Sequence, residues 1–163
     1  MNITSKSRYA LKIMTHLAHA EFGAIVKRHE IVKAQHIPEK YLDQIISRLR
    51  VGGFVQSVRG RSGGYLLLHR ADTIKVWDIF KAVEDHFYPV RCVDGHEVQQ
   101  CELFDVCETR ESWKYIYDAI KGTLEDMSLE SVIRSKTGNK IKAEGFALAQ
   151  RQRDFANLTL GQG

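Results

Sequence analysis

Residues 54–69 have the sequence FVQSVRGRSGGYLLLH, in which two apolar runs flank a basic, glycine-rich centre. Short runs of β-branched, aromatic and leucine residues on either side of such a centre are typical of two antiparallel strands and their turn. We predict one strand over residues 54–58, a turn over 59–64 and a return strand over 65–69. The turn carries Arg59 and Arg61 to the tip of the hairpin, where glycines allow the backbone to approach another molecule closely.

Three helices are predicted before this hairpin. The first follows Thr4 or Ser5, either of which is suited to cap a helix, and runs to about residue 20. The second covers residues 27–35, and the third covers residues 39–51. The third has the clearest helical period, with one apolar stripe that consists of Leu42, Ile45, Ile46 and Leu49.

A further set of elements is predicted after the hairpin. A short amphipathic helix covers residues 76–83, and a long helix covers residues 109–126, followed by another turn or two of helix over residues 129–133. The long helix has one apolar face, which we expect to form the seam of a dimer and which consists of Trp113, Ile116, Tyr117, Ile120 and Leu124. Residues 136–163 form a polar, basic tail, expected to be loosely ordered or to depend on a partner for its order.

The composition indicates a globular chain of 163 residues, 44% hydrophobic and 27% charged. No apolar run approaches the roughly 18–20 residues that span a membrane, so we predict a soluble, cytoplasmic protein. Charge is segregated along the chain: residues 1–70 hold 12 Lys and Arg against 4 Asp and Glu, and residues 71–133 hold 6 against 14. A basic half is typical of a phosphate-binding surface, although composition alone equally fits a solvated basic face.

The order helix, turn, helix, hairpin is that of a winged helix-turn-helix, in a fold that is mainly α with a small β-hairpin wing. The helical period of residues 39–51 turns outward a polar set suited to contact base edges in a major groove: Lys40, Tyr41, Asp43, Gln44, Ser47 and Arg48. Arg59 and Arg61 on the wing are suited to phosphate or to a narrow minor groove. Each feature alone also fits an ordinary surface helix or turn, whereas their order together with the basic charge favours DNA binding.

Several stretches of the chain resemble one known family: TSKSRYA at residues 4–10, IPEKYLDQ at 37–44, SRLR at 47–50, SVRGRSGGY at 57–65 and AVE at 82–84. Residues 3–92, which hold these stretches, resemble the bacterial iron–sulfur transcription regulators represented by IscR, NsrR and RirA. The resemblance as a whole covers about the first 130 residues. The resemblance implies a dimeric regulator with a palindromic DNA operator. It divides the chain into a DNA-binding domain (1–84), a cysteine-bearing loop (85–108), dimerisation helices (109–135) and the tail (136–163).

The resemblance also implies roles for single residues. Tyr41, Asp43 and Gln44 occupy positions at which family members contact bases, and Arg59 occupies the position that enters the minor groove. Asp43 stands where some members have a glutamate, so its shorter side chain implies a different preferred site.

All three cysteines lie in the predicted loop, with the spacing Cys92-x8-Cys101-x5-Cys107. This spacing is not that of a zinc ribbon, which needs paired Cys-x2-Cys elements. Three thiolates on one loop can converge on an iron–sulfur cluster, zinc or copper(I), and unliganded structural cysteines are the alternative. The resemblance implies an iron–sulfur cluster, and we favour a 4Fe–4S over a 2Fe–2S centre.

The fourth ligand is where the chain departs from its relatives. Family members have a histidine three residues after the last cysteine, where this chain has Arg110, or an acid near the first helix, where it has Arg8. Four other side chains in the loop could ligate but are expected to be solvated: His96, Glu97, Glu102 and Glu108. A fourth site held only weakly would make the cluster labile, as a sensor requires.

The sequence therefore predicts a sequence-specific DNA-binding regulator, a repressor, which senses iron, redox state or nitric oxide through a cluster. No catalytic constellation is found, so we expect no enzymatic activity. One alternative is a thiol- or zinc-based sensor without iron. The other is a redox or cluster-transfer protein in which DNA binding is vestigial.

Overall fold

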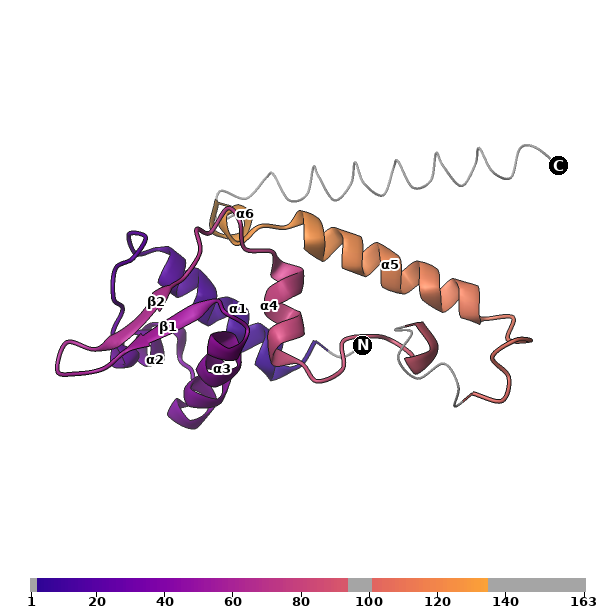
Figure 1. Ribbon diagram of the computed structural model, residues 1–163, viewed down its shortest axis with the longest axis horizontal. Helices are drawn as coiled ribbons and strands as arrows, with labels where there is room; N and C mark the ends of the chain where they lie inside the picture. The colour runs from indigo at the N-terminus through magenta and orange to yellow at the C-terminus, as the bar shows by residue number, and fades with distance from the viewer. Residues whose placement is uncertain (1–2, 94–100, 135–163) are drawn as a thin grey trace.

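The computed structural model describes residues 3–93 and 101–134, which form a mainly helical fold with one two-stranded hairpin (Figure 1). In chain order the elements are α1 (Ser5–Ala18), α2 (Arg28–Gln35), α3 (Glu39–Val51), β1 (Val55–Val58), β2 (Gly64–Leu67), α4 (Val76–Val83), the 3-10 helix η1 (Arg91–Val93), α5 (Arg110–Asp126) and α6 (Leu129–Arg134). The predicted fold class is confirmed. The predicted tail, residues 136–163, lies outside the described residues.

Local signals explain where the first helices begin and end. Thr4 caps α1, because its hydroxyl oxygen accepts a hydrogen bond from the amide of Lys6 at 3.0 Å. This helix ends at Ala18, slightly earlier than expected. Between α2 and α3 the chain turns sharply at His36, which adopts a left-handed conformation with φ of 50°. Helix α3 has the bounds that its periodicity predicts.

The hairpin is shorter than predicted but has the predicted antiparallel pairing, from Val55 opposite Leu67 to Val58 opposite Gly64. Its return strand is also held by the loop before α2, since the amides and carbonyls of Val26 and Tyr65 exchange two hydrogen bonds of 2.9 Å. A Cβ atom at Gly64 would collide with the carbonyl group of Val26. Glycine at this position therefore allows the loop to brace the base of the hairpin.

The core lies between α1, α3 and α4, with α6 packed against α1. The apolar stripe predicted for α3 is confirmed, because all four of its side chains are buried. Ile13 and Met14 of α1 and Ile79 of α4 meet this stripe and are themselves almost inaccessible. Burial of the stripe fixes the rotation of α3, so the opposite face of this helix must face outward.

Helix α5 extends away from this body, and its C-terminal half is fixed to it (Figure 1). There the amide of Val76 donates to the carbonyl of Met127 at 2.9 Å, and the amide of Leu129 donates to the carbonyl of Ile74 at 2.8 Å. The ring of Tyr117 packs edge-on against Trp77 of α4, with centroids 5.9 Å apart. None of the described helices is long and apolar enough to cross a membrane.

Candidate nucleic-acid interface and cysteine segment

The outward face of α3 carries most of the polar residues that the sequence predicts to contact DNA. Five of them are exposed: Lys40, Tyr41, Asp43, Gln44 and Ser47. The ring of Tyr41 packs edge-on against that of Tyr9 on α1, with centroids 5.7 Å apart. Its phenol is thus held by a neighbouring helix while 42% of the residue stays accessible. The face offers a row of donors and acceptors on a rigid helix.

Arg48, the sixth member of the predicted set, is half-buried and engaged within the molecule. Its Nη1 atom donates to the carbonyl of Val83 at 3.1 Å and to Oδ1 of Asp85 at 2.8 Å. No local pattern predicts this pairing, because 37 residues separate Arg48 from Asp85. Arg48 therefore links α3 to the end of α4.

Asp43 is exposed but already has a partner, Arg28, the first residue of α2. The Nε and Nη2 atoms of Arg28 donate to the two carboxylate oxygens of Asp43 at 3.2 and 3.0 Å. Its Nη1 atom donates to Oε2 of Glu39 at 2.8 Å. These hydrogen bonds, to Asp43 first and to Glu39 second, raise the pKa of Arg28 above its ordinary value. Arg28 is not among the site residues predicted from the sequence; its one local signal is a pair of acids, Glu39 and Asp43, spaced i and i+4 on the predicted third helix.

The wing tip presents Arg59 and Arg61, both exposed. Between them Gly60 has φ of 111°, a conformation that residues with a side chain rarely adopt. The turn is closed by a 2.9 Å hydrogen bond from the amide of Gly63 to the carbonyl of Gly60. A Cβ atom at Gly63 would collide with the carbonyl of Val58. The tip is therefore compact and leaves the two arginines projecting from a turn that only glycines can form.

Two acids at the end of α4 connect this region to α1. Oε1 of Glu84 accepts hydrogen bonds from the hydroxyls of Thr4 and Ser7, both at 2.6 Å, and from the amide of Ser7 at 3.2 Å. Burial opposes ionisation of Glu84, but these hydrogen bonds lower the pKa of its carboxyl overall. The next residue, Asp85, forms ion pairs with Lys6 at 3.0 Å and with Arg48 at 2.8 Å.

The predicted cluster ligands lie on the segment between α4 and α5. Cys92 in η1 and Cys107 are half-buried, Cys101 is exposed, and all three thiols are free of disulfides. The hydroxyl of Thr109, 3.5 Å from the Cys107 sulfur, lowers the pKa of that thiol, helped by the Thr109 and Arg110 amides. Free thiols, one of them disposed to ionise, are the donors that an iron–sulfur cluster requires.

The structure does not bring the ligands together. Over residues 3–93 and 101–134, no three His, Cys, Asp or Glu side chains form a group that could hold a metal ion. Of the considered fourth ligands, Glu102 and Glu108 are exposed, whereas His96 and Glu97 lie outside the described residues. The guanidinium of Arg110 packs over the ring of Phe104, 3.9 Å from its centroid.

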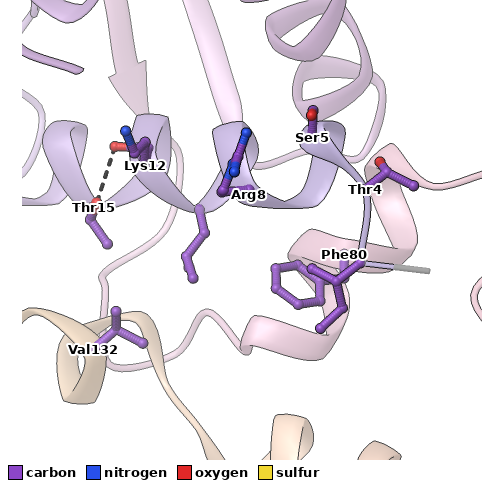
Figure 2. A pocket seen from close by; sticks show the side chains of 9 residues that line it. Thr4, Ser5, Arg8, Lys12, Thr15, Phe80 and Val132 are labelled. Carbon is purple, nitrogen blue, oxygen red and sulfur yellow. Dashed lines mark hydrogen bonds between the residues drawn. The ribbon is translucent and has the colours of Figure 1, made fainter. Parts of the chain in front are cut away.

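A groove of about 440 Å³ runs beside α1, between this helix, α4 and α6. Figure 2 shows Arg8 and Lys12 on α1 above Phe80 and Val132, which supply an apolar floor. The structure thus places Arg8, the other position considered for a fourth ligand, in the wall of this groove.

Comparison with known proteins gives one family model that matches the chain, Rrf2, described as an iron-dependent transcriptional regulator, over residues 3–135. A protein of Photorhabdus laumondii named HTH-type transcriptional regulator IscR is 39% identical over 137 residues, which are 83% of this chain and 81% of that protein.

Two solved structures share the fold at similar levels. The structure of CymR, the global cysteine regulator of B. subtilis, is 33% identical in sequence and superposes with a TM-score of 0.67. The match covers 82% of this chain and 97% of the CymR chain. The structure of T. potens IscR is 29% identical in sequence and superposes with a TM-score of 0.66. The match covers 83% of this chain and 88% of the T. potens chain.

Proposed function

Because the chain belongs to the Rrf2 family of transcriptional regulators, we propose that it acts as a homodimeric repressor whose affinity for its operator is set by an iron–sulfur cluster. The observation that carries the DNA-binding part is the joint position of α3 and the wing. Both lie at the end of the molecule opposite the free end of α5 (Figure 1). As a DNA-binding regulator the protein would act in the cytoplasm, and we assign it no enzymatic activity.

The dimensions of α3 fit a major groove. An α-helix with its side chains is about 10–12 Å in diameter and a major groove is about 12 Å wide, so the 13 residues of α3, about 20 Å long, can lie along the groove. In this arrangement Gln44 and Asp43 would contact base edges, Lys40 and Ser47 would contact phosphates or bases, and Tyr41 would reach the backbone. Arg59 and Arg61 would extend from the wing into the adjacent minor groove, where an arginine favours a narrow, A·T-rich sequence.

The dimer would form through α5. Part of its predicted apolar face is used within the chain, since Tyr117 and Leu124 pack against the core of their own protomer. Towards the N-terminus of the helix, Trp113 and Ile116 on the same face remain 40% and 42% exposed. A second copy with the same face would bury them around a two-fold axis, and a two-fold dimer pairs with a palindromic operator.

The cluster would be held by Cys92, Cys101 and Cys107. Cys92 lies in η1, which contacts α5, and Cys107 lies three residues before the first residue of α5. We favour a 4Fe–4S centre with a fourth site left to a weak or exchangeable ligand. When bound, such a cluster supplies a redox-sensitive, oxygen-labile group. The residues of this chain would hold it and, through Arg110, place a cation beside it.

One alternative has support of its own: a sensor that uses its thiols directly, without iron. The lowered pKa of Cys107 increases the fraction of this thiol that is present as the reactive thiolate, and the chain is similar to a protein named as a global cysteine regulator. Zinc held by the same thiols is a variant of this alternative. A cluster-transfer protein with vestigial DNA binding is the remaining one.

Two measurements test the proposal. Protein purified without oxygen should absorb visible light and contain iron and sulfide, and Ser at any one of the three cysteine positions should abolish the absorption. A colourless parent protein with bound zinc or no metal would instead support the thiol- or zinc-based sensor.

The second measurement is a DNA titration over a salt series. Affinity should fall steeply with salt, by close to one power of the salt concentration for each phosphate contacted. Absence of salt-dependent binding to any duplex would support the cluster-transfer alternative.

A further inference from the structure

We propose that Arg28 is a positioning residue for DNA recognition, which holds Asp43 in one orientation and balances the charge of the acidic edge of α3, defined as Glu39 and Asp43. The proposal rests on the DNA-binding function and adds a specificity-determining residue to it. Arg28 lies on α2, outside the helix that contacts the bases.

The geometry is that of a fork closed around one carboxylate. Arg28 offers Nε and Nη2 to the two oxygens of Asp43 and turns Nη1 to Glu39, so three of its five N–H groups are used. A two-pronged contact fixes the direction of the carboxylate as well as its distance. Each oxygen of Asp43 keeps a free lone pair, which can accept a hydrogen bond from the N4 amino group of a cytosine.

Fold stability does not account for this arrangement. The side chains of Arg28, Glu39 and Asp43 are 38%, 67% and 56% exposed. Ion pairs with such exposure contribute little to folding, because water and salt screen them. A duplex lying across α3 would exclude that water, and the same pairs would then act more strongly.

Charge supplies a second reason for the pairing. Two carboxylates on the edge of a helix that enters a groove lined with phosphates oppose binding. Arg28 cancels one of the two charges at hydrogen-bond distance, so Asp43 can approach DNA without the full repulsion of a free carboxylate.

The position of the pair at the junction of α3 and the wing also fits this role. Burial raises the pKa of Tyr65 on β2, the charge of Asp43 raises it further, and Arg28 opposes that increase. Asp43 and its partner therefore lie close enough to act on the wing as well as on α3.

The rival reading is that Arg28 itself contacts a phosphate. The two roles differ in whether the effect of removing Arg28 requires Asp43 to be present. A positioning residue loses its effect on sequence preference when Asp43 is removed, whereas a phosphate contact lowers affinity for every sequence whether or not Asp43 is present.

The test measures dissociation constants for the parent, Arg28→Ala, Arg28→Lys, Asp43→Ala and the double variant Arg28→Ala/Asp43→Ala. Each is titrated at one salt concentration with the selected operator, with operators changed at single base pairs, and with unrelated duplex. Arg50→Ala is the matched control, because it removes an exposed cation from the last turn of α3. Thermal melting checks that every variant is folded.

We expect Arg28→Ala to lower discrimination at one base pair by about tenfold, and to lower it no further in the Asp43→Ala background. Arg28→Lys keeps the charge but not the fork, so it should restore affinity for unrelated duplex and leave discrimination impaired. Arg50→Ala should weaken all duplexes by the same factor.

Equal losses on every duplex in both backgrounds would overturn the positioning role and make Arg28 a phosphate contact. An unchanged sequence preference in Asp43→Ala would overturn it as well. Failure of the proposed function is distinct from either result, since the parent protein would then bind no duplex with salt dependence.

Discussion

Glu84, at the end of α4, accepts a 2.6 Å hydrogen bond from the hydroxyl of Ser7, which is fully buried on α1. Seventy-seven residues separate the two positions. The carboxylate also receives the Ser7 amide and the Thr4 hydroxyl, so one side chain fastens the first turn of α1 to the point where the chain leaves the DNA-binding body.

Ser7→Ala should destabilise the fold by about 1–2 kcal/mol, because it removes a buried donor to a charged acceptor. Urea unfolding measures this loss. Ser5→Ala is the control, since Ser5 is exposed on the same turn and a change there should stay within about 0.5 kcal/mol. Equal stability of Ser7→Ala and the parent would show that the remaining donors to Glu84 compensate fully.

Acid should weaken the contacts of Glu84 and Asp85. Hydrogen bonds and ion pairs with Arg48 and Lys6 lower the pKa of Asp85 to about 2 from 3.8, and the pKa of Glu84 is also lowered. Both groups ionise more readily in the folded chain, so their contribution to stability is complete above about pH 5 and is lost as the pH falls towards 2.

The measurement compares the parent with Glu84→Gln/Asp85→Asn. Their difference in free energy of unfolding should be constant from about pH 7 to 5 and shrink below that. High salt should reduce the part due to Asp85, whose ion pairs are exposed. A difference that grew on acidification would contradict the assignment.

Arg59→Ala should weaken operator binding and leave the fold intact, because an exposed turn contributes little to the core. The loss should be larger for operators with an A·T-rich minor groove beside the contacted bases than for G·C-rich ones. Fluorescence anisotropy at fixed salt measures both. Arg70→Ala removes a cation beyond the other end of the hairpin and should show no such sequence dependence. Equal affinity of Arg59→Ala and the parent would exclude the wing from recognition.

Arg110→His should slow the bleaching of the cluster in air, since an imidazole three residues after Cys107 can supply the missing ligand. The substitution also removes the cation that packs on Phe104, an effect that opposes the first. Arg110→Lys separates the two, because it keeps the charge and offers no imidazole. Decay of the visible absorption decides between them: faster bleaching of the histidine variant would make Arg110 a stabilising cation beside a cluster with a better fourth ligand.

Ile116→Glu should convert the dimer to a monomer without loss of helix, as it places a charge in the proposed seam of α5. Sedimentation velocity gives the oligomeric state and circular dichroism the helix content. Tyr115, 60% exposed on the opposite side of the helix, provides the control Tyr115→Glu. Dissociation by the control alone would move the dimer contact to the other face.

Elements with a strong local signal were predictable from the sequence. Helix α3 has an uninterrupted apolar period between Pro38 and a pair of glycines, and its bounds match the structure. The wing has a turn that only glycines can form. In contrast, Arg28 and Glu84 act through partners 15 and 77 residues away, and no periodicity along the chain records which charged side chains meet in space.

The arrangement of the cysteine segment was likewise not predictable from sequence patterns alone. Its spacing and donor types indicate a soft metal, but convergence of Cys92, Cys101 and Cys107 depends on how the segment folds around what it binds. The predicted seam on α5 was divided for a related reason. The helical period shows that Tyr117 belongs to an apolar face, but it does not show whether that face packs on Trp77 of the same chain, as observed, or on a second copy.

In mechanical terms, α5 is a projecting beam whose second half is clamped to the body by the contact of Tyr117 with Trp77 and by the backbone hydrogen bonds that join Val76 to Met127 and Leu129 to Ile74. Residues 110–116 form the free arm, which is about 10 Å long, and Cys107 lies just before its first residue. A displacement of about 2 Å at the end of this arm corresponds to a tilt of about 11°. A small shift of the cysteine segment would therefore act on a short arm whose base is held by side-chain packing and by backbone hydrogen bonds.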